Sequence, residues 1–138
     1  MTASDMPSVR ETPTNRPMLE AWRKEGTLLL QRCEACGKAT FYPRSACPHC
    51  WGSLVWFRAS GNGRIVSFSL VHRGLPAAFE GETPIVLAEI RLDEDALMIA
   101  RIVTEDRAAI ASGGGVELVP AAEAARFALP TFVPRRDR

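Results

Sequence analysis

Four cysteines, arranged in two pairs, are the feature that most constrains how this chain can fold. The pairs are Cys33-x-x-Cys36 and Cys47-x-x-Cys50, and the 138 residues include no other cysteine. A C-x-x-C on a tight turn presents two thiolates to one metal ion, and two such turns supply the four soft ligands of a tetrahedral zinc site. We therefore predict one structural metal site that is formed by all four cysteines.

The choice of metal follows from the ligands. A site of four thiolates leaves no open position for a substrate, so it favours a structural role over catalysis at the metal. Zinc is the expected ion, and an iron site of the rubredoxin kind, which would need electron-transfer partners, is the alternative. Two disulfide bonds would also use four cysteines, but they belong to oxidising compartments.

The compartment can be predicted from the N-terminal sequence and the apolar runs. The first 17 residues have no apolar core of the signal-peptide kind. No run of apolar residues approaches the length of a transmembrane helix, so no membrane association is expected. We therefore expect a cytoplasmic protein whose thiols stay reduced and free to bind metal.

The charge of the chain is nearly balanced but unevenly spread. The formal net charge is +1, which gives no general reason to expect a nucleic-acid partner. Residues 1–64 hold nine Lys/Arg against five Asp/Glu, whereas residues 65–138 hold eight against eleven. The cysteines lie in the positive half, which weakly favours an anionic partner for that region, although chance explains the asymmetry equally well.

The N-terminal part reads as a tail followed by a short helix. Residues 1–14 are polar and rich in Pro, Thr and Ser, and we expect a disordered tail there. A helix is predicted to begin near Asn15, with Pro17 in its first turn, and to end at Gly26. Its apolar stripe consists of Met18, Leu19 and Trp22. With a lead-in strand, this segment spans residues 15–30.

The remainder is predicted to be mainly β, as a zinc ribbon over residues 31–54, an OB-fold domain over 55–134 and a tail over 135–138. Alternating apolar residues and turn signals indicate five barrel strands. They are expected at 64–71, 84–92, 96–103, 116–119 and 126–133. A long loop follows the first strand and a short helical segment, near 106–111, lies between the third and the fourth, which is the order of a five-stranded OB-fold barrel.

Several of these motifs together carry a family resemblance. They are Leu30-Gln31-Arg32-Cys33-x-x-Cys36-Gly37-Lys38, Tyr42-Pro43-Arg44, Cys47-Pro48-x-Cys50, Gly61-x-Gly63, Val66-x-Phe68, Thr83-Pro84, Glu89-Ile90-x-Leu92-Asp93 and Phe127 to Pro134. The chain resembles the acyl-CoA-associated family that pairs a rubredoxin-like zinc ribbon with an OB-fold and was long described as a domain of unknown function. The resemblance runs from about Leu19 to Pro134. The chain departs from the usual pattern at two places. Gly113-Gly114-Gly115 stands where a tighter turn of glycine and an apolar residue is common, and Trp51 stands where a glycine often follows the last cysteine.

The resemblance implies a function that lies in a complex. Members are typically small partners of thiolase-like enzymes, or of hydratase-like proteins, in fatty-acid, steroid and polyketide-type pathways. It implies that Cys33, Cys36, Cys47 and Cys50 hold a structural zinc ion, and no catalytic residue carries over. We therefore expect a non-catalytic accessory subunit within a hetero-complex, which helps to bind or shield a CoA thioester.

Two other functions stay open on the sequence alone. OB-folds and zinc ribbons both bind single-stranded nucleic acid, through aromatic platforms and basic grooves. The near-neutral charge and the few aromatic residues in the barrel argue against that reading. A stand-alone acyl-CoA binder, acting as a carrier or a thioesterase, is the third interpretation.

The candidate binding residues fall into two groups. Guanidinium and ammonium groups around the ribbon and the first barrel strand could hold the phosphates of CoA, although a solvated face is favoured for each single residue. These candidates are Lys38, Arg44, Arg64 and Arg73. The candidate partner contacts are Trp22, Leu75 and Phe79, of which Trp22 is better explained as a packing anchor. For His49 and His72, surface or structural roles are favoured over a metal ligand and a general base.

Overall fold

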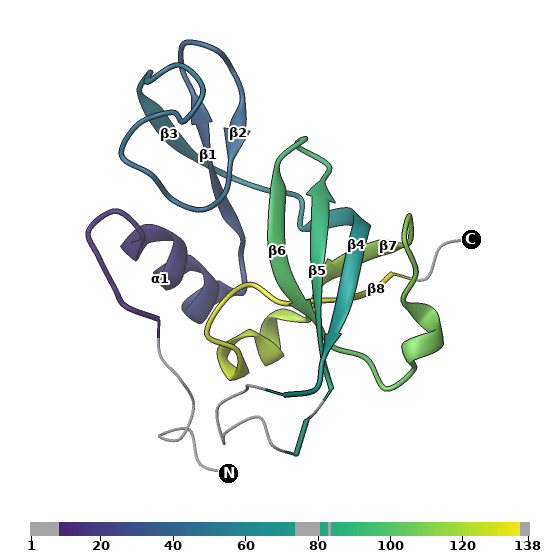
Figure 1. Cartoon of the computed structure of the whole chain (residues 1–138). Coiled ribbons are helices and arrows are strands. Elements are labelled where there is room, and N and C mark those ends of the chain that lie inside the picture. Colours follow the sequence, from purple (N-terminus) through teal and green to yellow (C-terminus); the bar gives the residue numbers. More distant parts are fainter. Residues whose placement is uncertain (1–8, 74–80, 83, 136–138) are drawn as a thin grey trace.

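A computed structural model describes residues 9–73, 81–82 and 84–135. Figure 1 shows three parts: a small three-stranded ribbon at one end, a β-barrel, and a helix that lies below the ribbon and beside the barrel. Within the described residues, no helix is both long and apolar enough to cross a membrane.

Helix α1 (Arg16–Glu25) confirms the predicted N-terminal helix. Pro17 occupies its first turn, and Gly26 ends it in the left-handed conformation with φ of 66°. Three apolar side chains on one face are fully buried: Met18, Leu19 and Trp22. Before the helix, Thr12 and Asn15 exchange backbone-to-side-chain hydrogen bonds of 2.7 and 3.2 Å, so part of the segment expected to be a tail is a defined turn.

The ribbon is an antiparallel sheet with the strand order β2-β1-β3. Its strands are β1 (Leu29–Cys33), β2 (Ala39–Thr40) and β3 (Leu54–Arg58). The first cysteine pair begins at the end of β1, and β3 leaves the second pair and leads to the barrel. This arrangement is a zinc ribbon, as the sequence predicted.

The barrel consists of β4 (Asn62–Val71), β5 (Ile85–Leu92), β6 (Leu97–Ile102), β7 (Gly115–Leu118) and β8 (Phe132–Pro134). It is closed in the order β4-β5-β6-β8-β7, with β6 and β8 parallel and the other neighbours antiparallel. A short 3₁₀ helix, η3 (Arg107–Ala109), lies between the third and fourth barrel strands. The mainly β fold with a five-stranded OB-like barrel is therefore confirmed.

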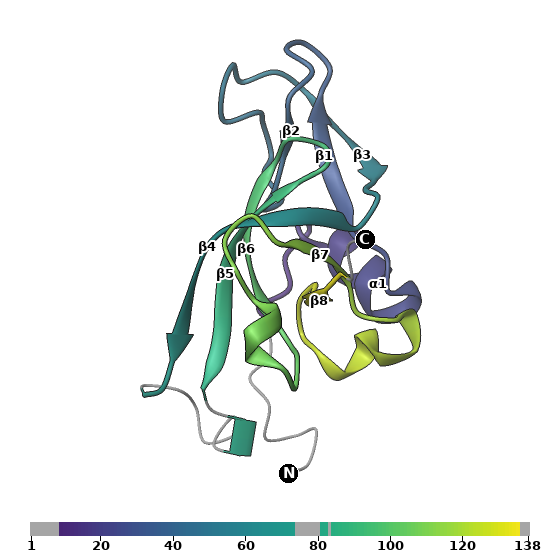
Figure 2. The same ribbon diagram turned by 90° about the vertical axis from the view of Figure 1, so that its right-hand side faces the viewer.

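The predicted strand over residues 126–133 is wrong for most of its length. The chain forms a 3₁₀ helix, η4 (Ala121–Arg126), and only Phe132–Pro134 pairs as β8. The segment lies against α1 instead: the Trp22 indole donates to Phe127 O at 3.0 Å, and an added Cβ on Gly26 would lie 2.8 Å from the Cα of Ala121 in η4. Figure 2 shows η4 beside α1.

One hydrophobic core joins the ribbon to the barrel. Its largest buried members include Ile90, Ile102 and Phe132 inside the barrel, and Leu28 and Leu30 at the start of the ribbon also belong to it. A second cluster places Trp22 against Val119 and Ala124. Because the lead-in to the ribbon is buried in the barrel core, the ribbon is anchored at its base.

Candidate metal centre

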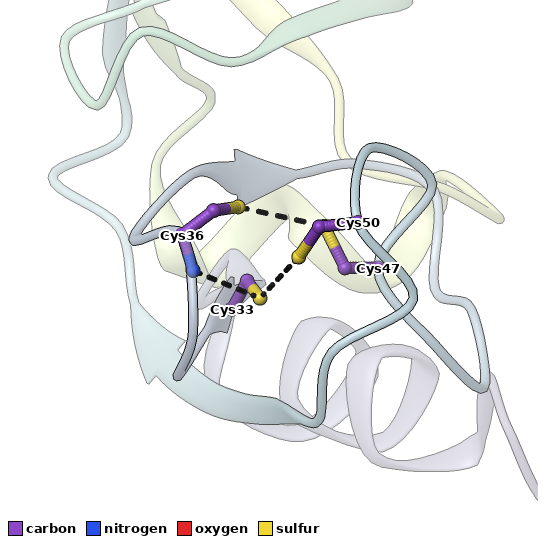
Figure 3. Close-up of side chains that lie close together, drawn as sticks. All are labelled: Cys33, Cys36, Cys47 and Cys50. Carbon is purple, nitrogen blue, oxygen red and sulfur yellow. Dashed lines mark hydrogen bonds between the residues drawn. The ribbon is translucent and has the colours of Figure 1, made fainter.

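The four cysteine sulfurs meet at the tip of the ribbon (Figure 3). All four lie within 4.8 Å of one another, and the thiols are free. The Sγ atoms of Cys33 and Cys50 are 3.5 Å apart, and those of Cys36 and Cys47 are 3.7 Å apart. A thiolate tetrahedron with Zn–S bonds of about 2.3 Å has edges of about 3.8 Å, so this donor set fits a zinc ion with little rearrangement.

The two cysteine turns are built in the same way. The backbone N–H of Cys33 donates to Lys38 O, and Gly37 N–H donates back to Cys33 O, at 3.0 and 2.9 Å. In the second turn, Cys47 N–H donates to Gly52 O and Trp51 N–H donates to Cys47 O, with the same two lengths. The repeated turn explains why the spacing C-x-x-C recurs, because each turn presents both sulfurs to one point.

Backbone N–H groups also point at the sulfurs. Ala35 and Cys36 donate to Cys33 Sγ at 3.3 and 3.4 Å, and His49 donates to Cys47 Sγ at 3.4 Å. Such donors stabilise a thiolate more than a thiol. The role of His49 in this structure is thus a backbone contact, while its side chain is exposed.

The thiol pKa values diverge as expected for four sulfurs that share one site. The backbone N–H of Cys36 is the main reason why the pKa of Cys33 lies at about 6. For Cys50, the Gly52 N–H lowers the pKa, but the Cys33 sulfur, burial and the two other cysteines outweigh it and raise the pKa to about 12. These opposite directions are expected of thiols that share one site, where a bound cation would displace the thiol protons.

The two residues that follow the last cysteine, Trp51 and Gly52, have conformations or neighbours that restrict which side chain can stand there. A Cβ on Gly52 would lie 2.8 Å from Cys33 Sγ, so only glycine fits there without a shift. Trp51 occupies the place that Gly37 holds in the first turn, with φ of 66° against 76°. Its side chain is 84% exposed, which makes it the most exposed large apolar side chain among the described residues.

The loop between the two turns is held by a buried side chain. Gln31, 5% exposed on β1, accepts a hydrogen bond from Arg44 N at 2.8 Å and donates to Arg44 O at 3.0 Å. Tyr42, two residues earlier, accepts a hydrogen bond from Asn15 Nδ2 at 3.0 Å. These contacts fix the ribbon loop to β1 and to the entrance of α1, and the sequence pattern had not singled out Gln31, Asn15 or Tyr42 for that role.

The four candidate phosphate contacts do not form one cluster. Arg64 donates to Gly113 O at 2.9 Å near the start of β4, whereas Arg73 follows the other end of that strand. Arg64 and Arg73 therefore lie toward opposite ends of β4. Lys38 and Arg44 are exposed on the ribbon. Which of the four contacts a CoA phosphate stays a prediction.

The candidate partner contacts separate as well. Trp22 is 0% exposed, and its indole Nε1–H donates to Phe127 O at 3.0 Å, which is the packing role preferred from the sequence. Its side chain offers no accessible surface to a partner in this conformation. Leu75 and Phe79 lie outside the described residues. His72 is exposed at the end of β4.

Sequence models of one protein family match most of the chain. The model of the ChsH2 rubredoxin-like zinc ribbon domain matches residues 23–55, and that of the ChsH2 C-terminal OB-fold domain matches residues 56–120. The two matches meet where β3 carries the chain from the ribbon to the barrel.

Two relatives match part of this chain. A probable enoyl-CoA hydratase alpha subunit of Thermomonospora curvata is 35% identical over 82 residues, which cover 58% of this chain but only 25% of that protein. A DUF35 domain-containing scaffold protein of Methanothermobacter thermautotrophicus is 36% identical over 90 residues, which cover 64% of this chain and 67% of that protein. This chain thus spans a quarter of the first relative and two thirds of the second.

A solved structure extends the likeness to nearly the full length. The structure described as Ltp2-ChsH2(DUF35) aldolase matches with a TM-score of 0.72 and 29% identity, and the match covers 94% of this chain and 98% of that one. The paired ribbon and barrel, the four cysteines and these matches all agree. The chain belongs to the ChsH2 (DUF35) family of rubredoxin-like zinc ribbon and OB-fold proteins.

Proposed function

We propose that this chain is a non-catalytic accessory subunit that binds a thiolase-like or hydratase-like acyl-CoA enzyme of fatty-acid, steroid or polyketide-type metabolism. The observation that carries the proposal is the nearly full-length match to the DUF35 protein of an aldolase structure. The relatives described as a hydratase subunit and as a scaffold protein support the same class of role.

We propose further that the four cysteines hold one zinc ion, which fixes the tip of the ribbon. The fit of the sulfur separations to a zinc tetrahedron supports this, and all four ligand positions are then filled by protein. The zinc would supply structure and no chemistry. Binding of zinc and folding of the ribbon tip are expected to be coupled.

We assign partner contact to the ribbon tip, where the exposed side chain of Trp51 would enter a pocket of the partner. A left-handed conformation costs a residue other than glycine roughly 1–2 kcal/mol, and the matching turn avoids this cost with Gly37. An 84% exposed indole adds nothing to the packing of this chain. Tryptophan is enriched among residues that dominate binding energy at protein interfaces, so a partner pocket accounts for both features.

The test is co-expression of the full chain with acyl-CoA enzymes of the same genome, beginning with those encoded beside it. We expect a complex that survives size-exclusion chromatography. In the variant Trp51→Gly, the isolated chain should be as stable as the wild type or more stable, yet its complex should dissociate at least about tenfold more easily. Trp51→Phe, which keeps an aromatic ring, is the control and should lose less.

Two results would contradict this assignment. A Trp51→Gly chain that binds the enzyme as tightly as the wild type would exclude Trp51 from the interface. A failure of every thiolase-like and hydratase-like enzyme of the host to associate with the zinc-loaded chain would contradict the accessory role itself.

A further inference from the structure

Strand β4 is longer than the part of it that closes the barrel. It pairs with β7 only over Asn62–Arg64, and Ile65 adds the last two hydrogen bonds on that side, with residues 113–114. Beyond Ile65, its only partner strand in the described part of the chain is β5. Figure 2 shows this part of β4 at the outer margin of the barrel, with β5 on one side of it. Residues 66–71 therefore form an edge strand.

The hydrogen bonds of β5 determine which backbone groups of β4 point to the open edge. The N–H of Leu92 donates across the turn toward β6 at 2.8 Å. Counted back from Leu92, alternate residues of β5 therefore face β6, and the residues between them face β4. Leu87 and Glu89 are among those that face β4. They lie opposite Ser69 and Ser67, whose backbone groups are thus used in the pairing of β4 with β5.

The residues that alternate with these serines present their backbone outward. Phe68 and Leu70 lie opposite residues of β5 that face β6, so their N–H and C=O groups point away from β5. Among the described residues, no other segment forms a hydrogen bond with these four groups. A row of unpaired backbone donors and acceptors is a template for a further strand.

The side chains along this edge are uncharged, and several are apolar. Residues 65–71 read Ile-Val-Ser-Phe-Ser-Leu-Val, without a charge or a proline. Val66, Phe68 and Leu70 are 42%, 39% and 39% exposed. Proteins usually protect an exposed edge strand with lysine, with proline or with a bulge. The irregularity in the pairing of β4 with β5 lies at Val66, before the outward-pointing groups, so it leaves these groups accessible.

We infer that this edge pairs with the same edge of a second copy of the chain, antiparallel and about a two-fold axis at Ser69. The axis sets Phe68 opposite Leu70 of the other copy, and Leu70 opposite its Phe68. Because the backbone groups of both residues point outward, the two pairs form four hydrogen bonds. The phenyl and isobutyl groups then cover each other on one face of a sheet that continues as β5-β4-β4-β5 through both copies.

The second copy is the occupant because the edge is complementary to itself. Its register places a free donor opposite a free acceptor, and an apolar side chain opposite an apolar side chain. Arg64 and Arg73 lie at the two ends of the edge, and antiparallel pairing brings Arg73 of one copy toward Arg64 of the other. Added salt should therefore not weaken the dimer, whereas it would weaken the binding of an acidic strand.

The expected affinity follows from the size of the contact. Six paired residues bury less surface than a standard stable interface, so we expect a dissociation constant of about 10–100 µM. The experiment is sedimentation velocity of the isolated, zinc-loaded full chain from roughly 5 to 500 µM. It should show monomer at the low end and dimer at the high end. A chain that stays monomeric throughout, or a dimer that salt dissociates, would overturn the inference.

Two cysteine variants test the register. Ser69 meets Ser69 of the second copy as a pair without mutual hydrogen bonds, and the Cα atoms of such a pair are about 4.5 Å apart, which a disulfide can span. Ser69→Cys should therefore form a covalent dimer in a glutathione buffer. Ser67→Cys should not, because Ser67 lies opposite Val71 of the other copy. Equal cross-linking of the two variants would overturn the register.

Two variants of Leu70 test the edge itself. Leu70→Pro removes only an outward-pointing N–H, which an edge strand tolerates, and Leu70→Glu places a carboxylate against the phenyl group of Phe68. Each should raise the dissociation constant of the dimer at least about tenfold, while circular dichroism shows a folded monomer. Leu97→Glu is the matched control, because Leu97 is 43% exposed on β6 and lies off this edge. A dimer that both Leu70 variants leave unchanged would place the interface elsewhere and overturn the inference.

This inference does not rest on the proposed function, and the two can fail separately. A chain that dimerises through β4 but joins no acyl-CoA enzyme contradicts only the accessory role. If the wild-type chain stays monomeric while Leu70→Glu weakens its complex with an enzyme, the edge receives a strand of that enzyme, and pairing with a second copy is excluded.

Discussion

Replacing Trp22 with phenylalanine should loosen the contact between α1 and the C-terminal segment. The side chain is 0% exposed, and its indole N–H donates to the carbonyl of Phe127 across 105 residues of sequence. The substitution keeps an aromatic ring but removes this donor, which costs about 1 kcal/mol, and leaves a void where the larger ring stood, which costs about 1–2 kcal/mol more. We expect the free energy of unfolding to fall by about 2–3 kcal/mol, and the melting temperature by roughly 10 °C.

The assay is thermal and urea unfolding of the zinc-loaded full chain, followed by far-ultraviolet circular dichroism. Trp51→Phe is the control, since an 84% exposed side chain should change the stability by no more than about 0.5 kcal/mol. The reasoning is refuted if Trp22→Phe stays within that same margin of the wild type, because the indole would then contribute neither a net hydrogen bond nor packing.

Three other substitutions test the metal site, the close backbone contact at Gly26 and the buried hydrogen bonds of Gln31. The variant Cys36→Ser should lose the bound zinc ion and the hydrogen-exchange protection of amides at the ribbon tip, while the barrel stays folded. Metal analysis and hydrogen exchange measure these two losses. Retention of stoichiometric zinc would argue against a four-thiolate site. Gly26→Ala should destabilise the chain by about 2 kcal/mol or more, because φ is 66° and the new Cβ would meet Ala121 Cα at 2.8 Å. The control Gly37→Ala, with φ of 76° and no atom within 4 Å, should cost about 1 kcal/mol, and equal costs in urea unfolding would exclude the steric argument. Gln31→Leu should lower the free energy of unfolding by about 1–3 kcal/mol, because it leaves the backbone groups of Arg44 unpaired; an unchanged urea midpoint would contradict this role.

The sequence predicted the parts of the fold that follow from local patterns. Proline in the first turn and glycine after the last turn located α1 within one residue at each end. The spacing of the cysteines located the two metal-binding turns, because each C-x-x-C forms its turn from nearby backbone hydrogen bonds. Alternation of apolar residues gave most strands of the barrel to within a few residues.

What the sequence did not predict depends on contacts between distant segments. The 3₁₀ helix η4 (Ala121–Arg126) packs against Trp22 of α1, and a local pattern carries no information on that neighbour. The ties of Gln31 to Arg44 and of Asn15 to Tyr42 also appear only in three dimensions. A hollow lined by Phe41 and Tyr42 of the ribbon loop, by β5 and β6, and by residues 127–131 was not predicted either, since its walls come from three separate parts of the chain.

The most direct test of the central claim is native mass spectrometry of the full chain co-expressed with the thiolase-like and hydratase-like enzymes of its host. The account predicts a hetero-complex with one of these enzymes, in which each copy of this chain carries one zinc ion. A zinc-loaded chain that remains separate from all of them, and whose addition leaves their acyl-CoA turnover unchanged, would contradict the account.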